Sequence, residues 1–280
     1  MVMVMLNAHI DGHPRLYHYQ PFTDPETDKF VNRLETTLRD GTIYMSRPSG
    51  FNDPWDFKPW FNMDVLDDPD EFARHQNWLL GLPHVANAPE AADEIQRDPR
   101  LLRAAIEAIR DGYVRELDQQ YRVYCMSPDP LIPLMWAHYG GSHRGVALEF
   151  DTCVDQLVGA YRVYYRDEYP PVRLYDEDAN NAILVPVFTK SAVWRYENEY
   201  RLVASEHGPV NPDMEHTENS VLRLRDGALS GLVIGCLCDT DHVLDLVDRH
   251  APHLRVRKAV RLPDRYELSF QTLRAGRLRA

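Results

Sequence analysis

Two glutamates separated by a single residue are the side chains of this sequence best suited to acid–base chemistry. Glu197 and Glu199 lie in residues 190–202, between Arg195 and Arg201. In a strand, the two carboxylates would share a face about 7 Å apart, bracketed by guanidinium groups. Close carboxylates raise each other's pKa, and the arginines oppose that rise. Such a pair predicts that one carboxylate stabilises positive charge while the other accepts a proton. A charged outer face of an edge strand is the alternative.

Three other segments carry side chains that could contact a ligand. A short predicted strand, residues 15–20, presents an imidazole that could reach a ligand hydroxyl or carbonyl, although a structural histidine at a strand end is the alternative. The turn at 51–56 could supply ligand contacts, and closing an Asx-turn is the alternative, structural role. The glycine-rich segment 135–145 could form an anion-holding turn, or only cap a helix and pack a tryptophan. The candidates are His18, Tyr19, Tyr44, Ser46, Asn52, Asp53, Asp56, Trp136, Tyr139 and Arg144.

The elements that must position these residues follow from the hydrophobic pattern. Alternating or apolar runs predict strands over residues 15–20, 42–46, 121–127, 145–150, 163–166, 194–204, 229–235, 255–260 and 266–270. Helical periodicity dominates residues 64–120, which are acidic in their first half and read as a solvated helical insertion. Strands and helices do not alternate regularly, so the sequence predicts an α+β fold with a mixed, mostly antiparallel sheet in one domain over residues 1–280.

The composition limits the classes of function. The chain has 280 residues, 31 basic and 43 acidic, and a net charge of −12, which disfavours broad non-specific binding to nucleic acids. Its four scattered cysteines predict no disulfide framework, and no apolar stretch approaches the length of a membrane span. We therefore expect a cytoplasmic protein with no membrane partner.

The motifs together resemble the bacterial and phage family known as domain of unknown function 2971. The resemblance rests on four segments that occur in the order 17–19, 51–56, 135–145 and 190–201, and it spans roughly residues 16–270. Some relatives are linked to abortive infection, so the resemblance implies an effector or toxin in phage defence. The family name itself carries no reaction.

A looser resemblance concerns mechanism, because the order of a strand His, a strand Tyr or Ser and a late Glu is similar to the signature of ADP-ribosyltransferases. By that resemblance His18 would hold NAD, Tyr44 or Ser46 would support the nicotinamide, and Glu199 would grip the ribose while Glu197 orients the acceptor. The chain lacks the Ser-Thr-Ser run of that superfamily, and the gap before Glu197 is long. The same interpretation places Tyr19, Trp136 and Tyr139 against NAD and Asn52, Asp53, Arg144 and Arg201 against the substrate, with no metal.

Three hypotheses follow from these residues. The first is ADP-ribosyl transfer from NAD, a small nucleotide substrate, to a nucleic acid or protein acceptor. The second is a Mg²⁺-dependent nuclease or other hydrolase that uses Asp53, Asp56, Glu197 and Glu199 as oxygen ligands. The third is a non-catalytic defence or interaction module.

Overall fold

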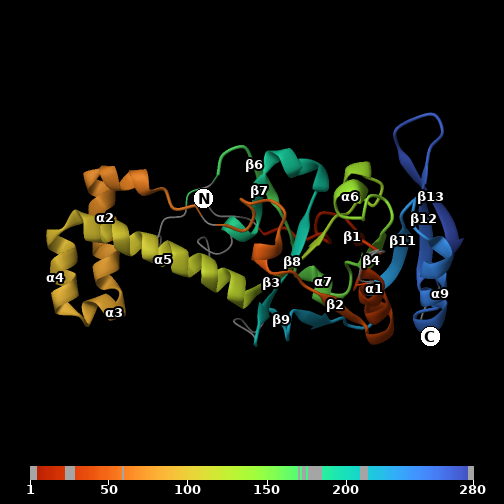
Figure 1. Cartoon of the computed structure of the whole chain (residues 1–280), viewed down its shortest axis with the longest axis horizontal. Helices are drawn as coiled ribbons and strands as arrows, with labels where there is room; N and C mark the ends of the chain where they lie inside the picture. The colour runs from red at the N-terminus through yellow and green to blue at the C-terminus, as the bar shows by residue number, and fades with distance from the viewer. Residues whose placement is uncertain are drawn as a thin grey trace. The chain divides into compact units, whose positions relative to one another are not determined.

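A computed structural model describes residues 5–22, 29–58, 60–169, 171, 175, 185–208 and 214–276 of the chain (Figure 1). The chain divides into two units. The helical unit comprises Met1–Val4, Phe51–Gln119 and Tyr164–Ala192. The sheet unit comprises Met5–Gly50, Gln120–Val163 and Val193–Ala280.

The helical unit contains the helices that the sequence predicts between residues 64 and 120. Proline opens each of the four α-helices between residues 69 and 120, where a missing N–H is tolerated, and the Asp68 side chain caps the first of these four by accepting from the amides of Asp70 and Glu71. The helices bury a small apolar cluster around Leu79 and Leu102. The elements are η2 (Met63–Asp67), α2 (Pro69–Gly81), α3 (Pro83–Ala86), α4 (Pro89–Arg97), α5 (Pro99–Gln120) and the parallel pair β6 (Tyr164–Arg166) and β7 (Thr189–Ser191).

A five-stranded sheet forms one half of the sheet unit. Its neighbouring strands are antiparallel except for the third and fourth, which are parallel. In spatial order the strands are β1 (Arg15–Gln20), β4 (Val146–Asp151), β11 (Leu229–Ile234), β12 (Arg255–Arg261) and β13 (Leu268–Arg274).

A second sheet is joined to the first through β1, because Tyr17 forms a β-bridge to Ser127 just beyond β3. Its strands are β3 (Tyr121–Met126), β8 (Tyr200–Glu206), β5 (Ala160–Arg162) and β9 (Glu215–Thr217), and a separate antiparallel pair joins β2 (Thr42–Tyr44) to β10 (Val221–Arg223). Most strand pairs in the described part of the chain are antiparallel. The predicted α+β fold with a mixed, mostly antiparallel sheet is confirmed.

Apolar side chains cover both faces of the five-stranded sheet. The larger cluster joins Leu16 and Phe150 to Tyr124 and Leu202 of the second sheet. A smaller cluster on the opposite face joins Tyr17 and Tyr19 to α6. The helices of this unit are α1 (Lys29–Asp40), α6 (Pro133–His138), α7 (Asp155–Val158) and α9 (Thr240–His250), with the short helices η1 (Pro48–Gly50) and η3 (Ala192–Glu197). Among the described residues, none of the helices combines the length and the apolar character that crossing a bilayer requires.

Two predicted helices extend beyond the part of the chain that the structure describes. Asp24 and Pro25 predict the start of a helix, which the structure shows as α1 from Lys29 onward, and residues 23–28 lie outside the described residues. The sequence also predicts a helix over residues 177–190, of which the described part is helical at 185–187 and becomes the strand β7 from Thr189.

Candidate functional site

The segment that carries both glutamates is not a continuous strand. Residues up to Glu197 form the short helix η3, Asn198 takes a left-handed backbone conformation with φ of 44°, and β8 begins only at Tyr200. Asn is one of the few residues that adopts this conformation readily, and it interrupts the alternation of a strand. The prediction of a strand over residues 194–204 is therefore wrong before Tyr200, and Glu197 and Glu199 do not share a strand face.

Glu197 is buried at the end of η3, where a tyrosine hydroxyl contacts its carboxylate. Tyr139 Oη donates a 2.6 Å hydrogen bond to Glu197 Oε1, and Glu197 is only 2% exposed. Tyr139 directly follows α6, so the end of α6 and the end of η3 position the two partners. Two of the residues predicted for the site, separated by 58 positions in the sequence, are thus brought together.

The residues next to Tyr139 and Glu197 in the sequence carry a cluster of aromatic rings. The ring of His138 lies 6.0 Å from that of Trp194 and 6.5 Å from that of Tyr196, and the Trp194 and Tyr196 rings are 6.1 Å apart. His138 is exposed, whereas Trp194 and Tyr196 are half-buried. We call His138, Tyr139, Trp194, Tyr196 and Glu197 the Glu197 site. Aromatic faces and a carboxylate both favour a flat, cationic ligand.

Two other residues predicted as ligand contacts, Trp136 and Tyr19, are buried in the protein and pack against each other. Trp136 is fully buried in α6 and donates from Nε1 to the Pro130 carbonyl at 2.8 Å. Tyr19 meets the Trp136 ring edge to face at 5.0 Å and donates to the Asp129 carbonyl at 2.8 Å. Burial raises the pKa of Tyr19 above its usual range, with Asp129 adding to the rise. Both side chains belong to the smaller apolar cluster, so they hold α6 in place.

Glu199 lies in a different electrostatic environment from Glu197. Arg201 Nε donates to Glu199 Oε1 at 2.8 Å and Arg201 Nη2 donates to Glu199 Oε2 at 3.1 Å. Arg201 is fully buried and Glu199 is 4% exposed. This two-pronged pairing is the strong form of an arginine–carboxylate contact. A carboxylate with both oxygens engaged in this way is well placed to stabilise the start of β8.

His18 is held inside the sheet unit. Its Nδ1 lies 2.8 Å from the Cys125 carbonyl, and its ring stacks on Tyr124 with 3.9 Å between centroids. Burial lowers the pKa of His18 to about 4, a fall that the hydrogen bond to Cys125 opposes and the charge of Arg33 reinforces. The imidazole is therefore neutral in the folded protein at pH 7.

His18 and the pair of Glu199 with Arg201 lie on opposite faces of the second sheet. Tyr124 and Cys125 are consecutive residues of β3, so their side chains point to opposite faces. Arg201 pairs directly with Cys125 across the strands and shares its face, whereas His18 stacks on Tyr124. The structure does not bring His18 and Glu199 to one face.

Tyr44 and Ser46 lie at and just after β2. Tyr44 is 43% exposed, and the guanidinium carbon of Arg33 lies 4.9 Å from the centre of its ring. Ser46 forms a backbone bridge to Val123, with hydrogen bonds of 2.9 Å in both directions. Both residues thus have a structural role in holding β2 beside its neighbours.

Arg144 lies in a tight loop between α6 and β4. Its side chain is exposed and donates a long 3.4 Å hydrogen bond to the Ser142 carbonyl. Gly145 closes the loop against β1, where a Cβ atom would lie 2.1 Å from the Gln20 carbonyl oxygen. The glycine at this position is explained by that close approach of two backbones.

The turn at residues 51–56 belongs to the helical unit. Asp53 Oδ1 accepts a 2.9 Å hydrogen bond from the Trp55 amide, which is the Asx-turn that the sequence predicts as its structural role. Asp56 is buried and lies 3.5 Å from Lys190 Nζ. Asn52 is exposed. Asp53, Asp56 and Lys190 line a cavity of about 290 Å³ within this unit.

The carboxylates proposed as Mg²⁺ ligands are divided between the two units. Asp53 and Asp56 belong to the helical unit, and Glu197 and Glu199 belong to the sheet unit. Within the described residues, no group of three or more His, Cys, Asp or Glu side chains is arranged to hold a metal ion.

Comparison with known proteins bears on the stretch that carries the Glu197 site. Residues 135–202 match the DUF2971 family model, which is described as a protein of unknown function. No curated protein and no solved structure matches the chain. The match covers α6 from Met135 onward, Tyr139, Glu197 and Arg201, and it supports the family resemblance that the motifs indicate.

His138, Trp194 and Tyr196 complete the Glu197 site, although the pattern of the sequence does not indicate them as contact residues. Trp194 and Tyr196 were placed on a strand, where they would face away from Glu197. In the short helix η3 side chains three positions apart lie on the same side, so Trp194 and Glu197 share one side of it. The signal that could have indicated the helix is Asn198, a residue that favours a left-handed conformation.

Proposed function

We propose that this chain transfers ADP-ribose from NAD, and that the Glu197 site is where the nicotinamide riboside end of NAD binds. The observation that carries the proposal is a buried carboxylate that accepts a hydrogen bond from a tyrosine hydroxyl, in two chain segments that also carry a cluster of three aromatic rings partly open to solvent. The nicotinamide of NAD is a flat pyridinium cation, which aromatic faces and a nearby carboxylate attract.

The reaction requires the breaking of one bond and the formation of another. The bond between the nicotinamide nitrogen and ribose C1′ breaks, and both of its electrons leave with nicotinamide, which becomes neutral. The ribose carries the positive charge in an oxocarbenium-like state until the acceptor nucleophile attacks C1′ and loses its proton. Glu197 stabilises that charge and accepts the proton, while Tyr139 orients the carboxylate.

This assignment changes the roles that the resemblance to ADP-ribosyltransferases implies. Glu197 takes the role given to Glu199, because Arg201 occupies both oxygens of Glu199. His18 serves the fold through its stacking on Tyr124 and its contact with Cys125. The acceptor is a nucleic acid or a protein, and the cell context is a phage-defence effector.

The proposal is tested by incubating the full chain with NAD and measuring nicotinamide release by chromatography and NAD affinity by calorimetry. We expect release by the wild-type chain. Trp194→Ala should weaken NAD binding by about tenfold, because an aromatic contact contributes about 1 kcal/mol beyond its buried area.

Val193→Ala is the matched control, since Val193 is the neighbouring residue of η3 and is 74% exposed. It should leave both readouts unchanged. If the wild-type chain neither binds NAD nor releases nicotinamide, the proposal is wrong and the non-catalytic module becomes the better hypothesis.

A further inference from the structure

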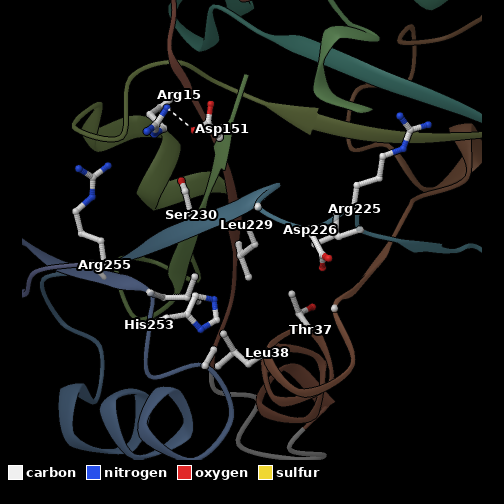
Figure 2. Close-up of a pocket in the computed structure, with 16 residues that line it drawn as sticks. Arg15, Thr37, Leu38, Asp151, Arg225, Asp226, Leu229, Ser230, His253 and Arg255 are labelled. Atoms are coloured by element: carbon white, nitrogen blue, oxygen red, sulfur yellow. Dashed lines mark ion pairs between the residues drawn. The ribbon is translucent and has the colours of Figure 1, made fainter. Parts of the chain in front are cut away.

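A cavity of about 510 Å³ lies in the sheet unit, away from the residues of the Glu197 site. Figure 2 shows it between the ends of the five-stranded sheet and α1, with Arg15 and Arg255 on one side, Asp226 on the other, and Thr37 and His253 below. Its volume is in the range of small-molecule sites, which is about 300–1,000 Å³. No residue predicted for the site from sequence lines this cavity.

The wall formed by Arg15 and Arg255 carries more positive than negative charge. Glu149 is fully buried in β4 and pairs with three arginines: Arg255 Nη2, Arg257 Nη2 at 2.6 Å and Arg15 Nε at 3.6 Å. Asp151 is the other carboxylate here, 3.1 Å from Arg15 Nη1. Arg257 and Glu149 lie behind the lining residues, so the three guanidinium groups face two carboxylates and leave one excess positive charge in and just behind this wall, in a chain whose net charge is −12.

Guanidinium nitrogens remain available on this wall. Arg15 uses Nη1 for Asp151 and the Pro14 carbonyl, and Arg255 uses Nη2 for Glu149. Among the described residues, Arg15 Nη2 and Arg255 Nη1 are left without a hydrogen-bond acceptor. Because Asp151 and the Pro14 carbonyl hold Arg15 and Glu149 holds Arg255, these nitrogens are donors already placed at the wall for an anion.

The rest of the cavity suits the uncharged part of such a ligand. Asp226 and the Thr37 hydroxyl lie across from the arginines, where they can bond ligand hydroxyl groups. Leu38, Leu229 and Leu254 supply apolar surface. Arg225 also lines this side, but it is paired with Asp155 and Glu215. The lining therefore offers guanidinium donors at one end, and polar and apolar groups beside a paired arginine at the other.

We propose that this cavity binds a phosphomonoester that carries hydroxyl groups, with the phosphate held by Arg15 and Arg255 and the hydroxyls by Asp226 and Thr37. A sugar phosphate and a nucleoside monophosphate share this chemistry. A phosphomonoester carries a charge of about −1.5 to −2 at pH 7, which offsets the excess positive charge of the wall. The site is separate from the Glu197 site and does not depend on the function proposed for it.

Isothermal titration of the full chain with ribose 5-phosphate, adenosine 5′-monophosphate, inorganic phosphate and adenosine tests the proposal. We expect at least one of the two phosphomonoesters to bind more tightly than inorganic phosphate, and adenosine to bind more weakly than either. Which of the two binds more tightly distinguishes a sugar phosphate from a nucleotide ligand. Arg255→Gln should weaken the binding by about tenfold, and Arg255→Lys by less.

Arg261→Gln is the matched control, because Arg261 is an exposed arginine of the same strand, β12, outside the cavity. It should change affinity by less than twofold. Should Arg255→Gln fail to fold, Arg15→Gln provides the same comparison from β1. The proposal is overturned if neither phosphomonoester binds, if adenosine binds as tightly, or if Arg261→Gln and Arg255→Gln lose affinity equally.

The test also separates this site from the proposed function. Arg255→Gln should leave nicotinamide release from NAD unchanged. Binding of ribose 5-phosphate by a chain that releases no nicotinamide would contradict only the proposed function. Loss of both activities in Arg255→Gln would show that the cavity belongs to the NAD site and would contradict the inference of a separate one.

Discussion

Glu197 and Glu199 are the same residue type two positions apart, yet the fold gives them different partners. Tyr139 contacts the carboxylate of Glu197 beside three other aromatic rings, whereas Arg201 binds both oxygens of Glu199 inside the protein. The left-handed Asn198 between them turns the two side chains apart. The comparison teaches that spacing alone does not decide which partners two neighbouring carboxylates find in the fold.

The far end of β8 carries a pair much like that of Glu199 with Arg201. Glu206 lies 3.0 Å from Arg122 Nε, and both side chains are almost completely buried. Burial opposes the ionisation of Glu206, but Thr217, the Ser220 amide and Arg122 together lower its pKa below the usual range. Buried ion pairs thus anchor both ends of β8, and the Glu197 site lies just before the first of them.

The largest effect is expected when the pair at the start of β8 is broken. Arg201→Met leaves Glu199 buried without its guanidinium partner, so we expect the free energy of unfolding to fall by about 3–5 kcal/mol. Urea denaturation followed by circular dichroism measures this change.

The double variant Glu199→Leu with Arg201→Met sharpens the comparison, because it removes both charges. It should recover most of the lost stability, since replacing a buried ion pair by apolar residues is often neutral. If the single Arg201→Met variant is as stable as the wild type, the pair does not anchor β8.

A smaller effect is expected from the pH dependence of His18. Its pKa in the folded protein is about 4, below the ordinary value of 6.5, so folding favours the neutral imidazole. The stabilisation is complete above pH 6.5 and is lost as the pH falls toward 4, by at most about 3 kcal/mol.

Comparison of the wild type with His18→Phe, by urea denaturation at several pH values between 4 and 7, isolates this contribution. The variant keeps a ring against Tyr124 but cannot titrate, so its stability should fall less steeply with decreasing pH. Parallel curves for the two proteins would show that His18 does not titrate abnormally. Nicotinamide release should stay within about threefold of wild type in this variant, because His18 lies outside the Glu197 site.

The smallest effect is expected at Tyr139. Tyr139→Phe keeps the ring and removes only the hydroxyl that bonds Glu197, so we expect the rate of nicotinamide release to fall by about tenfold and stability by about 1 kcal/mol. The rate is measured at saturating NAD and the stability by thermal unfolding. A loss of stability with an unchanged rate would mean that this hydrogen bond supports only the fold.

The strands of the sheet unit could be predicted from sequence because their apolar runs are local signals. The runs at β1, β3, β4, β11 and β12 each report burial directly. The contact of Arg201 with Glu199 is also local in the sequence, although Glu199 precedes β8 and does not lie on the strand where it was predicted. The residues before Asn198 form a short helix and Asn198 itself is left-handed. The alternation of polar and apolar residues predicted a strand here and does not reveal this break.

Contacts between residues far apart in the sequence could not be predicted. Tyr139 and Glu197 were both identified as candidates, but nothing in the sequence shows that they bond to each other. Glu149 and its arginines are separated by more than 100 positions on three different strands, so only the order of strands in the sheet brings them together. The cavity beside them had no sequence signal.

The most direct test of the account is to measure nicotinamide release and the urea midpoint of Glu197→Gln in parallel. The amide keeps the shape of the side chain and its hydrogen bond to Tyr139 but removes the negative charge. We predict that release falls by about 100-fold while the free energy of unfolding changes by no more than about 2 kcal/mol. Release that continues at the wild-type rate in a folded Glu197→Gln protein would contradict the central claim.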